Sequence, residues 1–178
     1  MKFTIRTVRD YGLTERLSLT TAFFLGSCIA LIFAMLDRLP DWVLPCSEQS
    51  FLPCFLRFTL PIVGAYLLGL SPLGLLTLPL LCAGAGWSIT ASSAAVVLHA
   101  GGRAFLDTVV SQGPGALIAL SAFFITAVPA FSCAGAQGSA MLSGGSVSRD
   151  AFSRSALTRL ALCCAAAALG ALFCMVLS

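Results

Sequence analysis

A serine and a histidine are the residues of this chain best suited to nucleophilic chemistry. Ser71 follows Gly69-Leu70, and His99 is the only histidine. A catalytic dyad needs the serine hydroxyl within hydrogen-bond reach of the imidazole. An uncharged run from Leu73 to Leu98 lies between them. As one helix this run places the two side chains roughly 40 Å apart, so we assign no catalytic residue.

The eight cysteines show no metal-binding spacing, and one histidine makes a metal site implausible. Six of the cysteines lie in apolar runs, where a thiol packs as a small hydrophobic group: Cys28, Cys82, Cys133, Cys163, Cys164 and Cys174. Cys46 and Cys54 differ, because they flank a polar loop that would face an oxidising exterior. A disulfide between them is sterically feasible, and the sequence leaves it open. We expect no metal and no cofactor.

The composition points to a lipid environment for all of these residues. The 178 residues are 58% hydrophobic and 10% charged, with a mean hydropathy of +0.99. Soluble domains carry roughly 25% charged residues, so the chain could not form a water-soluble surface. The net charge of +3 is not arranged as a basic patch interleaved with aromatic residues, which argues against nucleic-acid binding. The lipid bilayer is therefore the expected partner.

Five apolar runs are long enough to cross a bilayer, at residues 17–36, 54–70, 73–98, 116–142 and 160–177. The first run is longer than the apolar part of a signal peptide, and Asp37-Arg38-Leu39-Pro40 offers no cleavage site. Ser71-Pro72 separates the second run from the third, because proline disfavours a helical predecessor and removes a backbone donor.

The segments Asp37–Pro53 and His99–Gly115 are polar and predicted to be loops. We predict an all-α, polytopic membrane helix bundle with about five transmembrane helices, forming a single integral membrane domain over residues 1–178.

The charges between the spans predict the orientation. With the N-terminus inside, residues 1–16, 71–72 and 143–159 are cytoplasmic and hold seven of the ten Lys and Arg residues. The outer segments hold three basic residues and four acidic ones. Because cytoplasmic loops carry the excess of Lys and Arg, we predict a cytoplasmic N-terminus and an extracytoplasmic C-terminus.

Charged residues are absent from the middle third of every predicted span. Arg57 lies one turn inside a predicted helix end, from which it can reach the interface. Since charges deep in a membrane usually mark ion or proton pathways, this distribution disfavours an ion-coupled carrier. A facilitator of neutral solutes stays open.

The order of features resembles the stage II sporulation protein M family, which consists of multi-pass bacterial membrane proteins. The resemblance runs from about Leu17 to Ala134 and begins with Phe23-Phe24-Leu25-Gly26. Its strongest segment is Tyr66-Leu67-Leu68-Gly69-Leu70-Ser71-Pro72-Leu73-Gly74, at the turn between the second and third spans. A third span rich in small residues, then Gly101-Gly102 and Ser111-Gln112-Gly113, continue the pattern.

Two departures from the family pattern concern short motifs. The family's Pro-Gln-Asn is Ser111-Gln112-Gly113 here, and a Gly-x-x-x-Gly tendency in the third span appears as Gly86 and Thr90. Small side chains let membrane helices approach closely. Gly69, Gly74, Gly86 and Thr90 are therefore the candidate helix-packing residues, although Ala and Gly are also simply common in membrane helices.

The resemblance implies a non-enzymatic scaffold in the bacterial plasma membrane that anchors a peptidoglycan-degrading assembly during forespore engulfment. Its implied partners are a cell-wall hydrolase and another membrane-anchored protein, and a homo-oligomer stays open. The two outer segments would supply the contact surfaces. The rival hypothesis is a small membrane transporter or a solute-binding membrane subunit.

Overall fold

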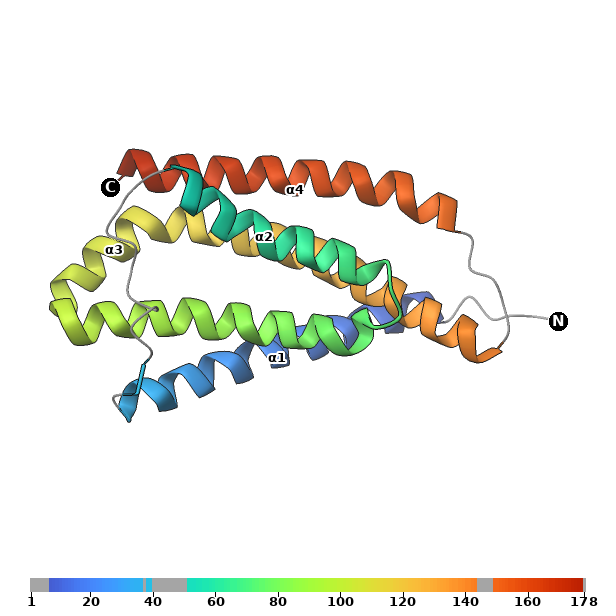
Figure 1. The fold of residues 1–178 in the computed structure, drawn as a ribbon, viewed down its shortest axis with the longest axis horizontal. Coiled ribbons are helices and arrows are strands. Elements are labelled where there is room, and N and C mark those ends of the chain that lie inside the picture. The colour runs from blue at the N-terminus through green and yellow to red at the C-terminus, as the bar shows by residue number, and fades with distance from the viewer. Residues whose placement is uncertain (1–6, 37, 40–50, 144–148, 178) are drawn as a thin grey trace.

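The computed structural model describes the backbone at residues 7–36, 38–39, 51–143 and 149–177, and these residues are almost entirely helical. Four helices follow in order: α1 (Thr7–Met35), α2 (Phe51–Gly69), α3 (Gly74–Ser143) and α4 (Arg149–Leu177). Each contains a stretch long and apolar enough to cross a membrane. The described part of the chain is thus an all-α bundle of potential membrane spans (Figure 1).

Helix α3 consists of two helical limbs that meet at Gly101. This residue has φ 83° and ψ 173°, which no α-helix contains and which residues with a Cβ rarely adopt. Leu75, early in the first limb, lies against Gly135, late in the second, while Ser88 and Ala116 line one cavity. The limbs are therefore antiparallel, and Figure 1 shows the ribbon turning back at this point.

With α3 folded back, the chain runs along the bundle five times in alternating directions, and the start of α1 and the end of α4 lie at opposite ends of the bundle (Figure 1). The short turn between α2 and α3 is closed by hydrogen bonds from the Ser71 N–H to the Leu68 carbonyl at 3.2 Å and from the Gly74 N–H to the Ser71 carbonyl at 3.0 Å. This turn separates the second and third passes where Ser71-Pro72 predicted a break.

The prediction of a polar loop at His99–Gly115 was wrong. Apart from Gly101, these residues are helical and continue into the second limb. The second limb therefore starts well before the predicted span at 116–142. Helices α1 and α4 likewise begin ten or eleven residues before the predicted spans 17–36 and 160–177, because their polar first turns are also helical.

Small residues form the core, and alanine is its most frequent member. Large apolar side chains point outward instead: Leu76 is 72% exposed, Leu80 71% and Leu60 70%. A bundle with leucine outside and alanine inside suits a lipid solvent, in which close backbone packing replaces the hydrophobic drive between helices.

Helix α3 organises the bundle, because α1, α2 and α4 all pack against it. Among the described residues α1 contacts only α3, whereas α2 also contacts α4. The larger core cluster accordingly joins Leu19 of α1, Ile62 of α2, Phe123 of α3 and Cys163 of α4.

One buried polar side chain is unsatisfied. The Thr59 hydroxyl of α2 is buried and has no hydrogen-bond partner in the described part of the chain.

Candidate functional site

Helices α1 and α3 are in backbone contact at Gly26 and at Gly86. A Cβ added to Gly26 would overlap the Ala83 carbonyl, and one added to Gly86 would overlap the Phe23 carbonyl. The Ser27 hydroxyl lies in the same contact, 3.1 Å from the Phe23 carbonyl oxygen and 3.3 Å from that of Gly86. The predicted packing residue Gly86 thus lies where two helix backbones touch.

Thr90 lies one helical turn beyond Gly86 and is half-buried. The close backbone contacts involve Gly86 and Gly26, and Gly26 was not among the predicted packing residues. Its presence in the first apolar span was the available signal, since small residues let membrane helices approach closely.

Gly69 and Gly74 hold the turn between α2 and α3 against the second limb of α3. A Cβ on Gly69 would lie 2.5 Å from the Ala130 Cβ, and a Cβ on Gly74 would lie 3.1 Å from the Ala134 Cβ. Both predicted positions are therefore in tight contacts between helices.

A third glycine contact, between α3 and α4, was missed. A Cβ on Gly170 would lie 2.7 Å from the Gly115 carbonyl oxygen, and one on Gly115 would meet Gly170 in the same way. The Cys174 thiol donates to the Gln112 carbonyl at 3.7 Å beside it. Gly115 follows Gly113-Pro114, which reads as a turn in the sequence, so nothing local indicated a helix contact there.

The remaining predicted site residues are separate from these contacts. Cys54 is half-buried near the start of α2, and Cys46 lies outside the described residues, so their disulfide stays a prediction. Ser71 lies in the turn before α3, and His99 near the far end of its first limb. No group of three metal-ligating side chains occurs within the described ranges.

Arg57 of α2 borders a cavity of about 370 Å³ between α2 and both limbs of α3. Helix α2 begins at Phe51, so Arg57 lies about 9 Å from the helix start, deeper than predicted. Its guanidinium donates to the Ser92 hydroxyl at 2.7 Å, and Ser92 donates to the Ser88 carbonyl at 2.6 Å. Apart from this polar side the cavity is lined mostly by apolar residues, among them Phe58, Leu81, Ala85, Leu120 and Phe123.

Another ionisable residue lies partly inside the bundle near its other end. Glu15 of α1 is half-buried, and its carboxylate accepts a hydrogen bond from the Ser132 hydroxyl on the second limb of α3. The predicted first span began after this residue. The contact between Glu15 and Ser132 instead makes it part of the packing between α1 and α3.

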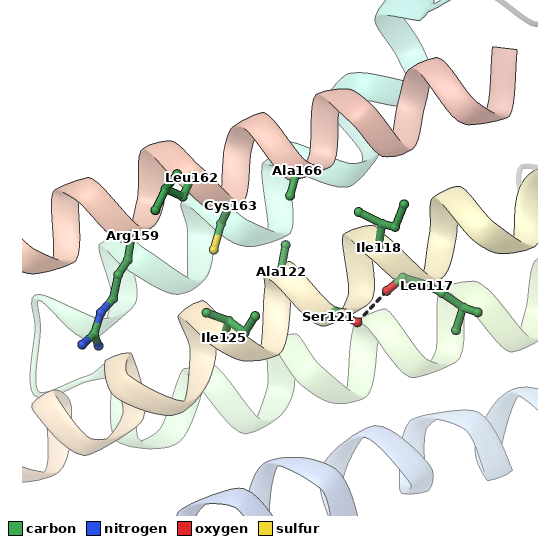
Figure 2. Close-up of a pocket in the computed structure, with 9 residues that line it drawn as sticks. All are labelled: Leu117, Ile118, Ser121, Ala122, Ile125, Arg159, Leu162, Cys163 and Ala166. Carbon is green, nitrogen blue, oxygen red and sulfur yellow. Dashed lines mark hydrogen bonds between the residues drawn. The ribbon is translucent and has the colours of Figure 1, made fainter. Parts of the chain in front are cut away.

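A groove of about 530 Å³ runs between the second limb of α3 and α4. Figure 2 shows the side chain of Arg159 reaching from α4 toward α3 at one end of this groove, and Ala122 and Ala166 facing each other further along. The Ser121 hydroxyl donates to the Leu117 carbonyl at 2.8 Å and is satisfied within its own helix. Arg159 is therefore the one charged residue in an otherwise nearly apolar lining.

The start of the second limb, residues 102–114, presents an exposed face at the end of the bundle that also holds the C-terminus (Figure 1). Four exposed residues recur at helical spacing along it: Arg103, Leu106, Asp107 and Val110. Leu106 is 62% exposed and Val110 70%. This face, termed here the end face, combines two apolar side chains with one charge of each sign.

Comparisons of the chain with protein-family models, with curated proteins and with solved structures give no match.

Proposed function

We propose that the chain is a five-pass integral membrane protein with a cytoplasmic N-terminus. Four helices are apolar enough to cross a membrane. The two limbs of α3, residues 74–100 and 102–143, are each longer than the roughly 20 residues that one crossing requires. The excess of basic residues at 1–16 and 143–159 supports the orientation. By its resemblance to the stage II sporulation protein M family, the membrane is the bacterial plasma membrane.

The function that we propose within this membrane is that of a non-enzymatic scaffold. The end face carries the proposal, because its exposed Leu106 and Val110 are flanked by Arg103 and Asp107, a mixture that suits contact with another protein. The glycine contacts support it as well, since they join α3 closely to α1, α2 and α4. A rigid bundle would hold such a face at a fixed position.

The proposed partners follow from the family resemblance. In the proposed orientation the end face lies outside the cell, where it would contact a cell-wall hydrolase of a peptidoglycan-degrading assembly. A second membrane-anchored protein would complete this assembly, which would act during forespore engulfment.

Site-specific photocrosslinking tests the scaffold proposal. A photoreactive phenylalanine derivative at Leu106 is expected to capture an extracytoplasmic protein in native membranes, and mass spectrometry should identify a cell-wall hydrolase in the adduct. The same derivative at Leu25, an exposed residue in the apolar part of α1, is the matched control. Equal adducts at both positions, or none at Leu106, would refute the end face as a contact surface.

The Arg57 cavity favours one second candidate, a membrane subunit that binds a small anionic solute. A guanidinium beside a mostly apolar cavity of about 370 Å³ suits a carboxylate or phosphate group with an apolar body. A screen of small carboxylates and phosphate esters for thermal stabilisation distinguishes the candidates. Stabilisation by a compound that Arg57→Gln abolishes would support the solute-binding subunit. If no compound stabilises the protein, the scaffold is the favoured function.

A further inference from the structure

The groove between the second limb of α3 and α4 has the polarity of a site for an amphiphile. Apolar side chains of both helices line it, including Ile118, Ile125 and Leu162, and Arg159 stands at one end. The Ser121 hydroxyl donates its hydrogen bond to the Leu117 carbonyl of its own helix. A ligand with an apolar chain and an anionic head would therefore match the groove along its length.

The position of Arg159 matches the depth of a lipid headgroup. The apolar stretch of α4 runs from Leu157 to Val176, so Arg159 lies near its boundary and is exposed. The acidic side chains that the structure describes are Glu15 and Asp107, and neither forms an ion pair with Arg159. Glu15 instead accepts a hydrogen bond from Ser132. An anion from outside the described chain can therefore approach this guanidinium.

The length of the groove matches one leaflet. On α4 it extends from Arg159 to Ala166, and this helical rise is about 10 Å. Half of a hydrocarbon core of about 30 Å is about 15 Å, so the groove stays within the leaflet whose headgroups lie at Arg159. A single extended acyl chain with an anionic head matches this length and the lone guanidinium at one end of the groove.

We propose that this groove binds one acyl chain of an anionic phospholipid, whose phosphate accepts hydrogen bonds from the Arg159 guanidinium. Arginine suits this role because its planar donors match phosphate oxygens. In the proposed orientation the bound lipid belongs to the cytoplasmic leaflet. The bound chain would fill the lateral gap between α3 and α4 and stabilise their packing. The inference rests on the proposed membrane insertion and is independent of any protein partner.

Native mass spectrometry and thermal unfolding of the purified full-length chain test this proposal. The probes are phosphatidylglycerol and phosphatidylcholine with identical acyl chains, added to the protein in a non-ionic detergent. For the wild-type protein we expect about five-fold greater occupancy by phosphatidylglycerol, the ratio that one arginine near an anionic headgroup supplies. Phosphatidylglycerol should also raise the unfolding midpoint more than phosphatidylcholine does.

Four variants distinguish the contribution of the Arg159 charge to lipid binding from that of the groove itself. Arg159→Gln should lose the preference for phosphatidylglycerol, and Arg159→Lys should keep most of it. Arg16→Gln removes another exposed arginine, from α1, which does not line the groove, and should keep all of it. Ser121→Leu fills the groove and should lower the occupancy of both lipids.

Three results would overturn the lipid site. These are equal binding of the two lipids to the wild-type protein, an Arg159→Gln protein that behaves like Arg16→Gln, and a dimer that Ser121→Leu dissociates. The dimer would show that a second copy covers the groove. Failure of membrane insertion is recognised separately, by release of the protein from membranes at alkaline pH.

Discussion

Gly26 on α1 lies against Ala83 on α3, and Gly86 on α3 lies against Phe23 on α1, so closely that neither glycine has room for a Cβ. The added carbon would overlap the Ala83 carbonyl in one case and the Phe23 carbonyl in the other. Since α1 packs only against α3 within the described residues, this contact is part of the single interface that joins the first helix to the bundle.

Gly86→Ala and Gly26→Ala should each destabilise the protein by about 1–3 kcal/mol, because overpacking forces the helices apart. Gly84→Ala is the matched control on the same limb, since its new Cβ would meet nothing within 4 Å. Its better helix propensity should raise stability by up to about 1 kcal/mol. Thermal unfolding in detergent compares the three variants, and similar midpoints for Gly84→Ala and Gly86→Ala would disprove the close contact.

The reversal of α3 depends on a conformation that glycine adopts easily. At Gly101, φ is 83°, and open space surrounds a Cβ added there or at Gly102. Gly101→Ala should therefore cost about 1–2 kcal/mol through backbone strain alone, while Gly102→Ala should be near neutral. Unfolding midpoints of the two variants measure this difference, and a neutral Gly101→Ala would show that the turn does not need the positive φ.

The buried Thr59 hydroxyl lacks a hydrogen-bond partner in the described part of the chain. Thr59→Val keeps the shape and removes the unsatisfied group, so it should raise the free energy of unfolding by about 1 kcal/mol. Thr77→Val is the control, because the Thr77 hydroxyl donates to the Leu73 carbonyl at 3.0 Å and the substitution loses that bond. A less stable Thr59→Val protein would indicate that the hydroxyl is satisfied in the membrane.

Arg57 and Ser92 link α2 to the first limb of α3 through a hydrogen bond of 2.7 Å. A double-mutant cycle with Arg57→Gln and Ser92→Ala should give a coupling energy of about 1 kcal/mol, because the bond is charge-assisted but Arg57 is exposed. The cycle is read from unfolding midpoints of the four proteins. Additive effects would mean that the two side chains do not interact.

The apolar runs were sufficient to predict the helical passes, because hydrocarbon favours helices that satisfy their own backbone groups. The helix at residues 102–114 was not predictable in the same way. Its Arg103, Asp107 and Gln112 are typical of a loop. Only the structure shows that the helix begins before the apolar run at 116–142.

Pairing between helices was harder to predict than the helices themselves. Gly86 could be singled out because small residues crowd its span, but its neighbour Gly26 depends on how α1 is rotated against α3. The Gly115–Gly170 contact joins residues far apart in sequence. No local pattern shows which faces of two apolar helices meet.

The sidedness of two positions tests the five-pass arrangement most directly. In a cysteine-free background, Arg154→Cys should resist an impermeant thiol reagent in intact cells and react after permeabilisation, whereas Leu106→Cys should react in intact cells. If α3 instead crossed the membrane only once, the start of α4 would lie outside and Leu106 within the bilayer. Ready labelling of Arg154→Cys with protection of Leu106→Cys would therefore contradict the five passes or their orientation.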